Sequence, residues 1–158
     1  WDVGVYPNSV AITMLGEGAP VEVWAQQTIG ESGVDVSMIA QLRFASGAVA
    51  QLSTGFRTPF REAVYLVGER GILHIAEPWK PGLTGRESVM TLTNLDDGAE
   101  QIVTPVVDPY LCEVQAMEAC VLDGAAPLVT LADSRSFLQS MLAIYQSART
   151  GQVVRVGA

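Results

Sequence analysis

The fold is decided by residues 38–54, which read MIAQLRFASGAVAQLST. Apolar and polar side chains alternate from Met38 to Phe44, and a period of two is the pattern of a β-strand with one face in a core. Ser46-Gly47 is a turn dipeptide, and a second strand is expected from Ala48 to Thr54. Because so short a connection joins neighbouring antiparallel strands, this segment predicts a hairpin within an antiparallel sheet.

Further strand segments lie on both sides of this hairpin. Val21–Trp24 alternates before it, while Glu69–Gly71 and Leu95–Gly98 are turns that separate later apolar runs. Residues 77–87 are rich in proline and glycine and predict a long loop. The other expected strands are Ala63–Val67, Ile72–Ala76, Val89–Thr93, Gln101–Thr104 and Val153–Val156.

Helices are expected towards both ends of the chain. Residues from about Asp2 to Leu15 show helical spacing, and Pro7 fits only near the first turn or a kink. Pro109–Leu122 predicts a second helix, and a capping box at Thr130–Asp133 starts a third that runs to about Arg149. The apolar stripe expected on the third helix is Ser134, Phe137, Leu138, Met141, Leu142 and Tyr145.

This order of elements predicts an α+β domain, with an open, mostly antiparallel β-sheet and helices on one face. Apolar residues occur on both strand faces, as Val49 and Leu52 illustrate. The open face is therefore expected to be covered by a partner, in a homodimer or higher homo-oligomer formed through the sheet.

Composition excludes several classes of partner. The length of 158 residues suits one domain with a sizeable core. The net charge is −8, and only 16% of the residues are charged, which is few for a soluble domain. No apolar run reaches the about 18 residues needed to span a membrane. The basic residues are scattered, which argues against nucleic acid and against anionic membrane surfaces.

The two cysteines indicate a reducing compartment. Cys112 and Cys120 fall in one expected helix, about 12 Å apart, which is too far for a disulfide. With no signal peptide visible, we expect a cytoplasmic protein. Because the chain opens with Trp1 and not with an initiator Met, directly at the start of an expected helix, we also expect that further residues precede it in the native protein.

Motifs that bind nucleotides or metals do not occur. The sequence has no G-x-G-x-x-G after a strand, no G-x-x-x-x-G-K-[ST], and no C-x-x-C, H-E-x-x-H or G-x-S-x-G. We therefore expect neither cofactor-binding residues nor a metal site in this chain.

The most informative residues are Asp2 and Tyr6. They are four positions apart, so on a helix their side chains would share one face, where a carboxylate can orient a phenol and accept its hydrogen bond. The alternative is a tyrosine that fills the core and an aspartate that caps the helix. Spacing alone favours this structural interpretation.

Asp2–Asn8, followed by a helix that ends in Leu15-Gly16, resembles the D-x-G-x-[HY] segment of the Gfo/Idh/MocA oxidoreductases. Val64–Leu73 is similar to that family's hydrophobic-G-x-x-G-x-hydrophobic hairpin. Later segments reproduce the family's order and spacing, namely Tyr110-x-x-Glu113, Gly124-x-x-Pro127, Asp133-Ser134 and Ser147–Gly151. The resemblance spans nearly the whole chain, and a tyrosine at position 6 is typical of the glucose–fructose oxidoreductase and dihydrodiol dehydrogenase branches.

The resemblance implies that residues 1–158 form the C-terminal substrate and dimerisation domain of a Rossmann-type dehydrogenase, with the N-terminal nucleotide-binding domain absent. NAD or NADP would be bound by that absent domain, which also holds the residue that selects between them. The implied reaction is hydride transfer between nicotinamide and a sugar, polyol or cyclic alcohol. Tyr6 would relay the hydroxyl proton, supported by Asp2.

A phenol needs a nearby cation to act as a base at neutral pH, because its ordinary pKa is about 10. The family supplies a lysine from an E-K-P motif of the nucleotide domain. Lys80 is the only lysine here, and its setting in Pro78–Gly82 does not match. The chain alone is therefore expected to be inactive.

Three further side chains are candidates for contact with a small, sugar-like substrate. Arg57 and Arg61 follow a strand and could reach a pocket rim, although a solvated loop is the commoner setting. Trp79 could stack on a sugar ring, although a loop tryptophan more often anchors its own loop. His74 stands alone within a strand and is expected to be structural.

Two other functions stay open. Relatives in the family use bound nicotinamide transiently in glycoside cleavage, and net turnover of cofactor would separate that chemistry from a dehydrogenase. The chain could also be a non-catalytic binding or assembly module. A G-x-G-x-x-G unit followed by E-K-P upstream of Trp1 would support catalysis.

Overall fold

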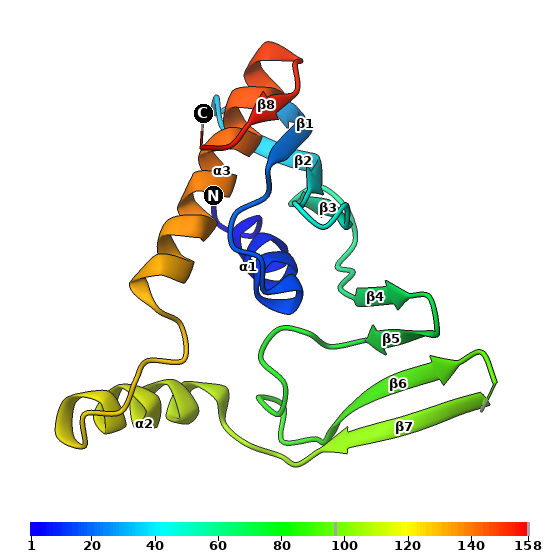
Figure 1. Ribbon diagram of the computed structural model, residues 1–158, viewed down its shortest axis with the longest axis vertical. Coiled ribbons are helices and arrows are strands. Elements are labelled where there is room, and N and C mark those ends of the chain that lie inside the picture. Colours follow the sequence, from blue (N-terminus) through cyan, green and yellow to red (C-terminus); the bar gives the residue numbers. More distant parts are fainter. Residues whose placement is uncertain (97, 158) are drawn as a thin grey trace. The chain divides into compact units, whose positions relative to one another are not determined.

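The computed structural model describes residues 1–96 and 98–157, and these divide into two units (Figure 1). Unit 1 comprises Trp1–Pro59 and the chain from Val129 onward, and unit 2 comprises Phe60–Leu128. Each unit has its own four-stranded antiparallel sheet. The α+β class is confirmed, and the expected strands divide between two hydrogen-bonded sheets.

Unit 1 has the sheet order β3-β2-β1-β8. Its elements are α1 (Val5–Leu15), β1 (Glu22–Ile29), β2 (Asp35–Arg43), β3 (Val49–Gly55), α3 (Leu131–Thr150) and β8 (Val154–Arg155). The hairpin expected within residues 38–54 is confirmed, since β2 pairs with β3 in the register Ala40↔Leu52. Gly47 adopts φ 93° in the turn, a conformation that glycine reaches without strain.

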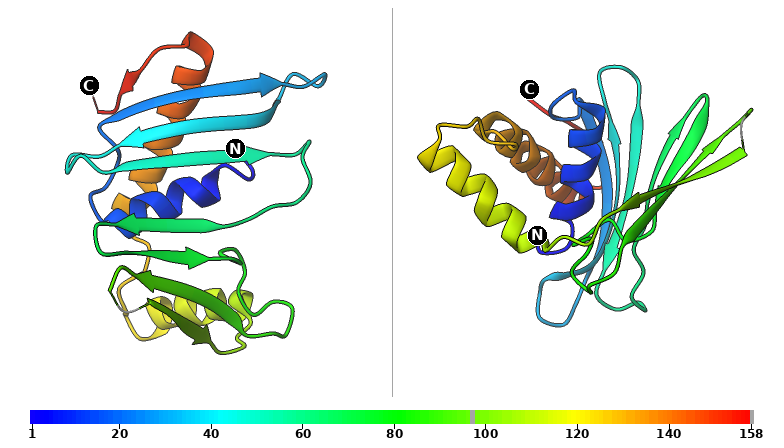
Figure 2. Two further views of the ribbon diagram at one scale, coloured as in Figure 1. Left: turned by 90° about the vertical axis from the view of Figure 1, so that its right-hand side faces the viewer. Right: turned by 90° about the horizontal axis from the view of Figure 1, so that it is seen from below.

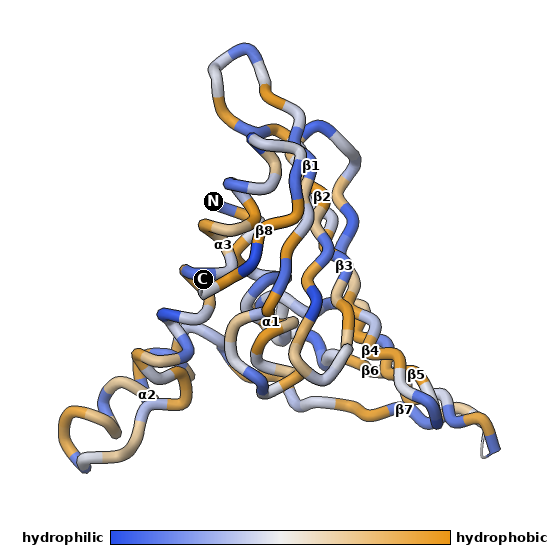
Figure 3. Tube along the Cα trace, turned by 45° about the horizontal axis from the view of Figure 1, so that its top comes forward, coloured by the Kyte–Doolittle hydropathy of each residue, from blue (hydrophilic) through white to orange (hydrophobic). Residues whose placement is uncertain are grey.

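The core of unit 1 lies between this sheet and the helices, and Figure 2 shows α1 and α3 on the same side of β1–β3. Alternation brings one face of each strand into the core, and the tube of Figure 3 shows hydrophobic and hydrophilic residues alternating along these strands. Leu42 and Phe44 are fully buried there. Each such side chain contributes about 1.5–3 kcal/mol through burial.

The buried face of α3 differs from the expected stripe. Met141 is buried, but Leu138 and Leu142 are 50% and 53% exposed and Ser134 is exposed, so the expectation is wrong at these three positions. The buried face consists of Met141, Ile144 and three small residues, Ser140, Ala143 and Ser147. The small side chains allow the helix to approach the strands closely. The Ser147 hydroxyl accepts the backbone N–H of Ala25 at 2.9 Å and donates to the Gln152 carbonyl at 2.6 Å.

The local sequence explains where α3 and α1 begin. The capping box of α3 is confirmed, with Thr130 and Asp133 each accepting from the other's backbone N–H. Helix α1 begins at Val5, three residues after the expected start, so Asp2 lies in the preceding turn. Pro7 falls in the first turn of α1, where its missing N–H removes no helical hydrogen bond.

Unit 2 has the sheet order β4-β5-β6-β7. Its elements are β4 (Val64–Gly68), β5 (Gly71–Ile75), β6 (Ser88–Asn94), β7 (Gly98–Thr104) and α2 (Pro109–Leu122). The expected loop at residues 77–87 is confirmed between β5 and β6. In the predicted turn Leu95–Gly98, Asp97 lies outside the described residues, and Gly98 has φ 78°.

Helix α2 buries none of its residues, and Cys112 and Cys120 within it are both free thiols, as expected. Among the described residues, no helix has both the length and the apolar character required to cross a bilayer.

Candidate functional site

Tyr6 and Asn8 lie on opposite sides of the first turns of α1. At 100° per residue, two positions correspond to 200° around the helix. Asn8 is completely buried, whereas Tyr6 is 43% exposed. A tyrosine whose only role was to fill the core of unit 1 would not keep this exposure, so the position of Tyr6 suits contact with a molecule outside the unit.

The expectation that Asp2 and Tyr6 share one helical face is wrong, because α1 begins only at Val5. Because Asp2 lies in the turn that precedes the helix, the two residues are not neighbours on a regular helical face. Asp2 is exposed at this end of the unit. The roles assigned to both residues stay predictions.

Asn8 and Ser140 form a buried polar clamp between α1 and α3. Both residues have 0% exposure. The Ser140 hydroxyl donates to Asn8 Oδ1 at 2.6 Å, and Asn8 Nδ2 donates to the Phe137 carbonyl at 3.2 Å. Sequence reasoning missed this clamp, because its partners are 132 and 129 positions apart and no local spacing indicates them.

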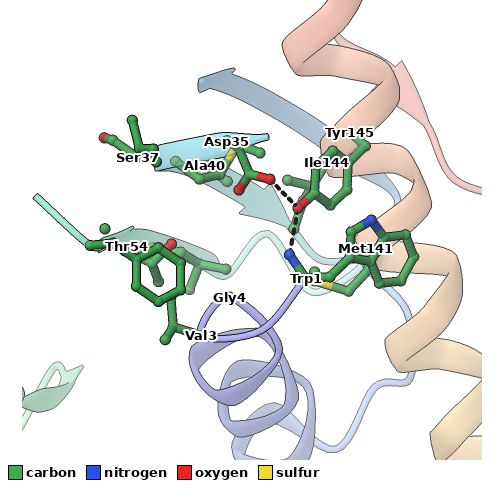
Figure 4. Close-up of a pocket in the computed structure, with 15 residues that line it drawn as sticks. Trp1, Val3, Gly4, Asp35, Ser37, Ala40, Thr54, Met141, Ile144 and Tyr145 are labelled. Carbon is green, nitrogen blue, oxygen red and sulfur yellow. Dashed lines mark hydrogen bonds between the residues drawn. The ribbon is translucent and has the colours of Figure 1, made fainter. Parts of the chain in front are cut away.

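A small cavity of ≈ 20 Å³ lies beside the segment that leads into α1. Trp1, Val3 and Gly4 line it on one side and Met141, Ile144 and Tyr145 of α3 on another, with the rest of the lining from β2, β3 and Phe56, which follows β3 (Figure 4). This volume accommodates about one water molecule, too little for a sugar. The lining is mostly apolar, so the cavity is a feature of packing.

The structure does contain a phenol–carboxylate pair, at Tyr145 and Asp35. The Tyr145 hydroxyl donates to Asp35 Oδ1 at 2.9 Å, and the ring stacks on Trp1 with a centroid distance of 5.2 Å (Figure 4). Burial, together with the hydrogen bond and charge of Asp35, raises the pKa of Tyr145 to about 12. At neutral pH Tyr145 is therefore a protonated donor and not a base.

The three candidates for substrate contact fall in both units. In unit 1 the Arg57 guanidinium lies beside the turn at Gly30, where a Cβ would approach Arg57 Nη2 to 3.5 Å. Arg61 and Trp79 belong to unit 2, with Arg61 exposed and Trp79 half-buried. Their substrate contacts stay predictions.

Two other side chains singled out in the sequence have structural partners in unit 2. His74 stacks on Tyr65 across β5 and β4, with ring centroids 4.4 Å apart and planes 7° from parallel. Lys80 places its ammonium 5.7 Å from the ring centroid of Tyr110 and has a left-handed φ of 57°. Within residues 1–96 and 98–157, no three His, Cys, Asp or Glu side chains gather in a way that would hold a metal ion.

Comparisons with known proteins show which family this domain resembles. Residues 1–74, which include Asp2, Tyr6 and Asn8, match the model of the GFO/IDH/MocA C-terminal domain. The chain is also 33% identical to a D-xylose 1-dehydrogenase (NADP+) from Haloferax volcanii over 98% of its own length. The chain is thus identified with the GFO/IDH/MocA C-terminal domain over residues 1–74. It spans about half the length of that relative, covering 47% of it.

Solved structures agree with this assignment. A 3-ketoreductase from Actinomadura kijaniata, in complex with TDP-benzene and NADP, matches with a TM-score of 0.76 and 28% identity over 95% of this chain and 46% of its own. An aldose–aldose oxidoreductase from Caulobacter crescentus, complexed with glycerol, matches with a TM-score of 0.80 and 24% identity over 97% of this chain and 46% of its own. Because the second match is only 24% identical, it shows a similar fold and nothing further.

Proposed function

We propose that this chain is the C-terminal half of an NAD(P)-dependent oxidoreductase that transfers hydride between nicotinamide and a sugar, polyol or related cyclic alcohol. The observation that carries the proposal is the 33% identity, over 98% of this chain, to an NADP-dependent D-xylose dehydrogenase. D-Xylose and NADP⁺ are therefore the first substrate and cofactor to test.

The proposal assigns cofactor binding to a nucleotide-binding domain elsewhere in the same protein. This chain has no glycine-rich strand–helix motif to hold a pyrophosphate, and it spans only 47% of the dehydrogenase it matches. Bound nicotinamide would accept the hydride from the carbinol carbon. The residues of this chain would bind and orient the alcohol and move its proton.

Tyr6 is proposed as the proton relay. Its side chain is exposed at the first turn of α1, on the side of the helix opposite the buried Asn8. In oxidation, the C–H bond of the carbinol breaks with transfer of hydride, the O–H proton passes to the Tyr6 oxygen, and a carbonyl forms. Since an ordinary phenol is a poor base at neutral pH, the proposal requires a cation from the rest of the protein.

The remaining assignments concern specificity and assembly. Asp2 supports Tyr6 electrostatically, and Arg57, Arg61 and Trp79 contribute to the substrate pocket. The protein self-associates through exposed strand faces, and we place it in the cytoplasm. Trp24 and Ile39, which are 37% and 51% exposed on β1 and β2, support such an interface in unit 1.

The test is turnover of D-xylose and related sugars by the intact protein with NADP⁺ and NAD⁺. Tyr6→Phe should lower turnover by about 10²- to 10⁴-fold while cofactor binding persists, as expected for a general acid–base group. Asp2→Asn should give a smaller loss. Retention of more than about half of the turnover by Tyr6→Phe would show that the acid–base assignment is wrong. Glycoside cleavage without net change in NAD(P)H would favour the other nicotinamide chemistry.

A further inference from the structure

Tyr6 lies between two points at which the start of α1 is fixed to α3. At the first point, Gly4 packs against Met141, since a Cβ at Gly4 would lie 3.7 Å from Met141 Cε. At the second point, the side chain of Asn8 contacts Ser140 and the backbone of Phe137. The backbone on both sides of Tyr6 therefore rests on one face of α3.

The contact at the second point consists of two hydrogen bonds, which depend on direction as well as on distance. The Asn8 amide uses its oxygen to accept from Ser140 at 2.6 Å and its nitrogen to donate to Phe137 at 3.2 Å. Both side chains are completely shielded from water, so any rotation of α1 would leave a buried polar group without a partner. Apolar packing alone tolerates small rotations, but this pair of hydrogen bonds specifies one orientation.

This orientation determines where the phenol of Tyr6 lies. Tyr6 is two residues before Asn8 and is 43% exposed on the other side of the helix. Any rotation of α1 about its own axis would displace the hydroxyl at the end of the ring. Proton transfer requires donor and acceptor within hydrogen-bonding distance, and a displacement of about 1 Å can cost about 10²-fold in rate.

We propose that Asn8 and Ser140 are positioning residues that hold Tyr6 in register with the reacting alcohol. The inference rests on the proposed function of Tyr6. It adds that two side chains with no access to substrate determine the turnover number through the orientation of α1.

The test compares two serines of α3 that differ in position and agree in burial. Ser140 and Ser147 both have 0% exposure and both use their hydroxyl groups, but Ser147 bonds to Ala25 and Gln152 and not to α1. In the intact enzyme, Ser140→Ala should lower kcat about tenfold with little change in cofactor KM. Ser147→Ala should lower the melting temperature but leave kcat within about twofold.

A double-mutant cycle shows whether the effect passes through Tyr6. In a Tyr6→Phe background, Ser140→Ala should change the residual turnover by less than about twofold, because the group that it misplaces is already absent. An undiminished tenfold loss in that background would overturn the inference, as would equal kcat values for Ser140→Ala and Ser147→Ala. Full activity of Tyr6→Phe would instead show failure of the proposed function itself.

A second variant guards against simple misfolding. Asn8→Leu combined with Ser140→Ala removes both polar partners together, which avoids an unsatisfied buried group. We expect this variant to fold and to show the same loss of kcat. A folded double variant with wild-type kcat would overturn the positioning role.

Discussion

The two units use similar strand patterns but differ in how much they bury. Every buried hydrophobic side chain of the described residues lies in unit 1, between its sheet and helices α1 and α3. In the described part of unit 2, one alternating set of sheet residues is only half-buried, and the one buried polar side chain, Ser88, has no hydrogen-bond partner for its hydroxyl.

Alternation of apolar and polar residues therefore specifies a strand but does not by itself build a core. In unit 1, α3 lies directly on β1 and completes a two-layer structure, whereas α2 of unit 2 buries no residue. β4 leaves apolar side chains exposed, such as Tyr65 at 60% and Val67 at 74%, and this is the strand face on which the proposed self-association can be tested.

The largest expected effect distinguishes the units by one substitution made twice. Phe44→Ala in unit 1 removes a fully buried ring and should cost about 3–5 kcal/mol of unfolding free energy. Phe60→Ala in unit 2 truncates a ring that is 88% exposed, and should change stability by less than about 0.5 kcal/mol. Denaturant unfolding of both variants is the measurement. A comparable loss for Phe60→Ala would mean that unit 2 buries this side chain in solution.

The next prediction concerns the exposed strand face of unit 2. Val67→Glu should weaken self-association at least tenfold, about 1.4 kcal/mol, because a carboxylate would have to be desolvated in the interface. Val153→Glu introduces the same charge at a position that is 59% exposed in unit 1, next to β8, and should leave association unchanged. Sedimentation velocity over a range of concentrations measures both. Equal association of the two variants would move the interface away from β4.

Most helices, strands and turns could be predicted from the sequence, whereas the division into two units could not. Periodicity and turn residues located the helices and strands, because both signals are local. The capping box at Thr130 and the hairpin at Ser46-Gly47 were correct for the same reason. The start of α1 was placed too early, because Asp2 looked like a helical residue although Gly4 is the N-cap.

The site was less accessible to such reasoning. Tyr6 could be singled out because its family segment is contiguous. The contacts that orient it depend on α3, which comes more than 120 residues later, and on the buried side chain of Ser140, a polar residue that hydrophobic periodicity overlooks. The same limit applied to Asp35 and Tyr145, whose contact joins positions 110 residues apart.

A smaller effect is expected for the phenol–carboxylate pair of unit 1. Tyr145→Phe removes the hydrogen bond to Asp35 and should cost about 1 kcal/mol at neutral pH. Because the folded-state pKa of Tyr145 is raised to about 12 from 10, the folded protein holds this proton at higher pH than the unfolded chain. Stability should therefore fall as pH rises through that window in the wild type, and less steeply in the variant.

The control is Tyr65→Phe in unit 2, where the ring stacks on His74 and the side chain is 60% exposed. This variant keeps the stacked ring, so its stability should match that of the wild type. Urea unfolding at several pH values compares the two variants. A loss for Tyr65→Phe as large as that for Tyr145→Phe would contradict the contrast between a bonded and a solvated hydroxyl.

The smallest expected effect lies in unit 2 and depends on a pair of like charges. Glu62 and Glu77 flank the paired residues Val64 and Ile75, so the antiparallel register brings the two carboxylates towards each other. Burial first, and then the charge of Glu77, raises the pKa of Glu62 above its ordinary value of 4.5. The folded protein thus retains the proton of Glu62 at a pH where the unfolded chain has lost it. Stability is therefore expected to fall as pH rises from 4.5 through the folded-state pKa, and to stay lower above it.

Glu62→Gln removes this ionisation. The variant should be more stable than the wild type at pH 7, by less than about 0.5 kcal/mol because the site is largely solvated, and no more stable at pH 3. Glu77→Gln should recover only part of the gain, since it removes the repulsion but leaves the burial of Glu62. Trp79 is the only tryptophan of unit 2, and its fluorescence in a background lacking Trp1 and Trp24 would follow unfolding of this unit. A gain of the same size at pH 3 and pH 7 would show that Glu62→Gln acts through packing and that the carboxylate pair contributes nothing to the pH dependence.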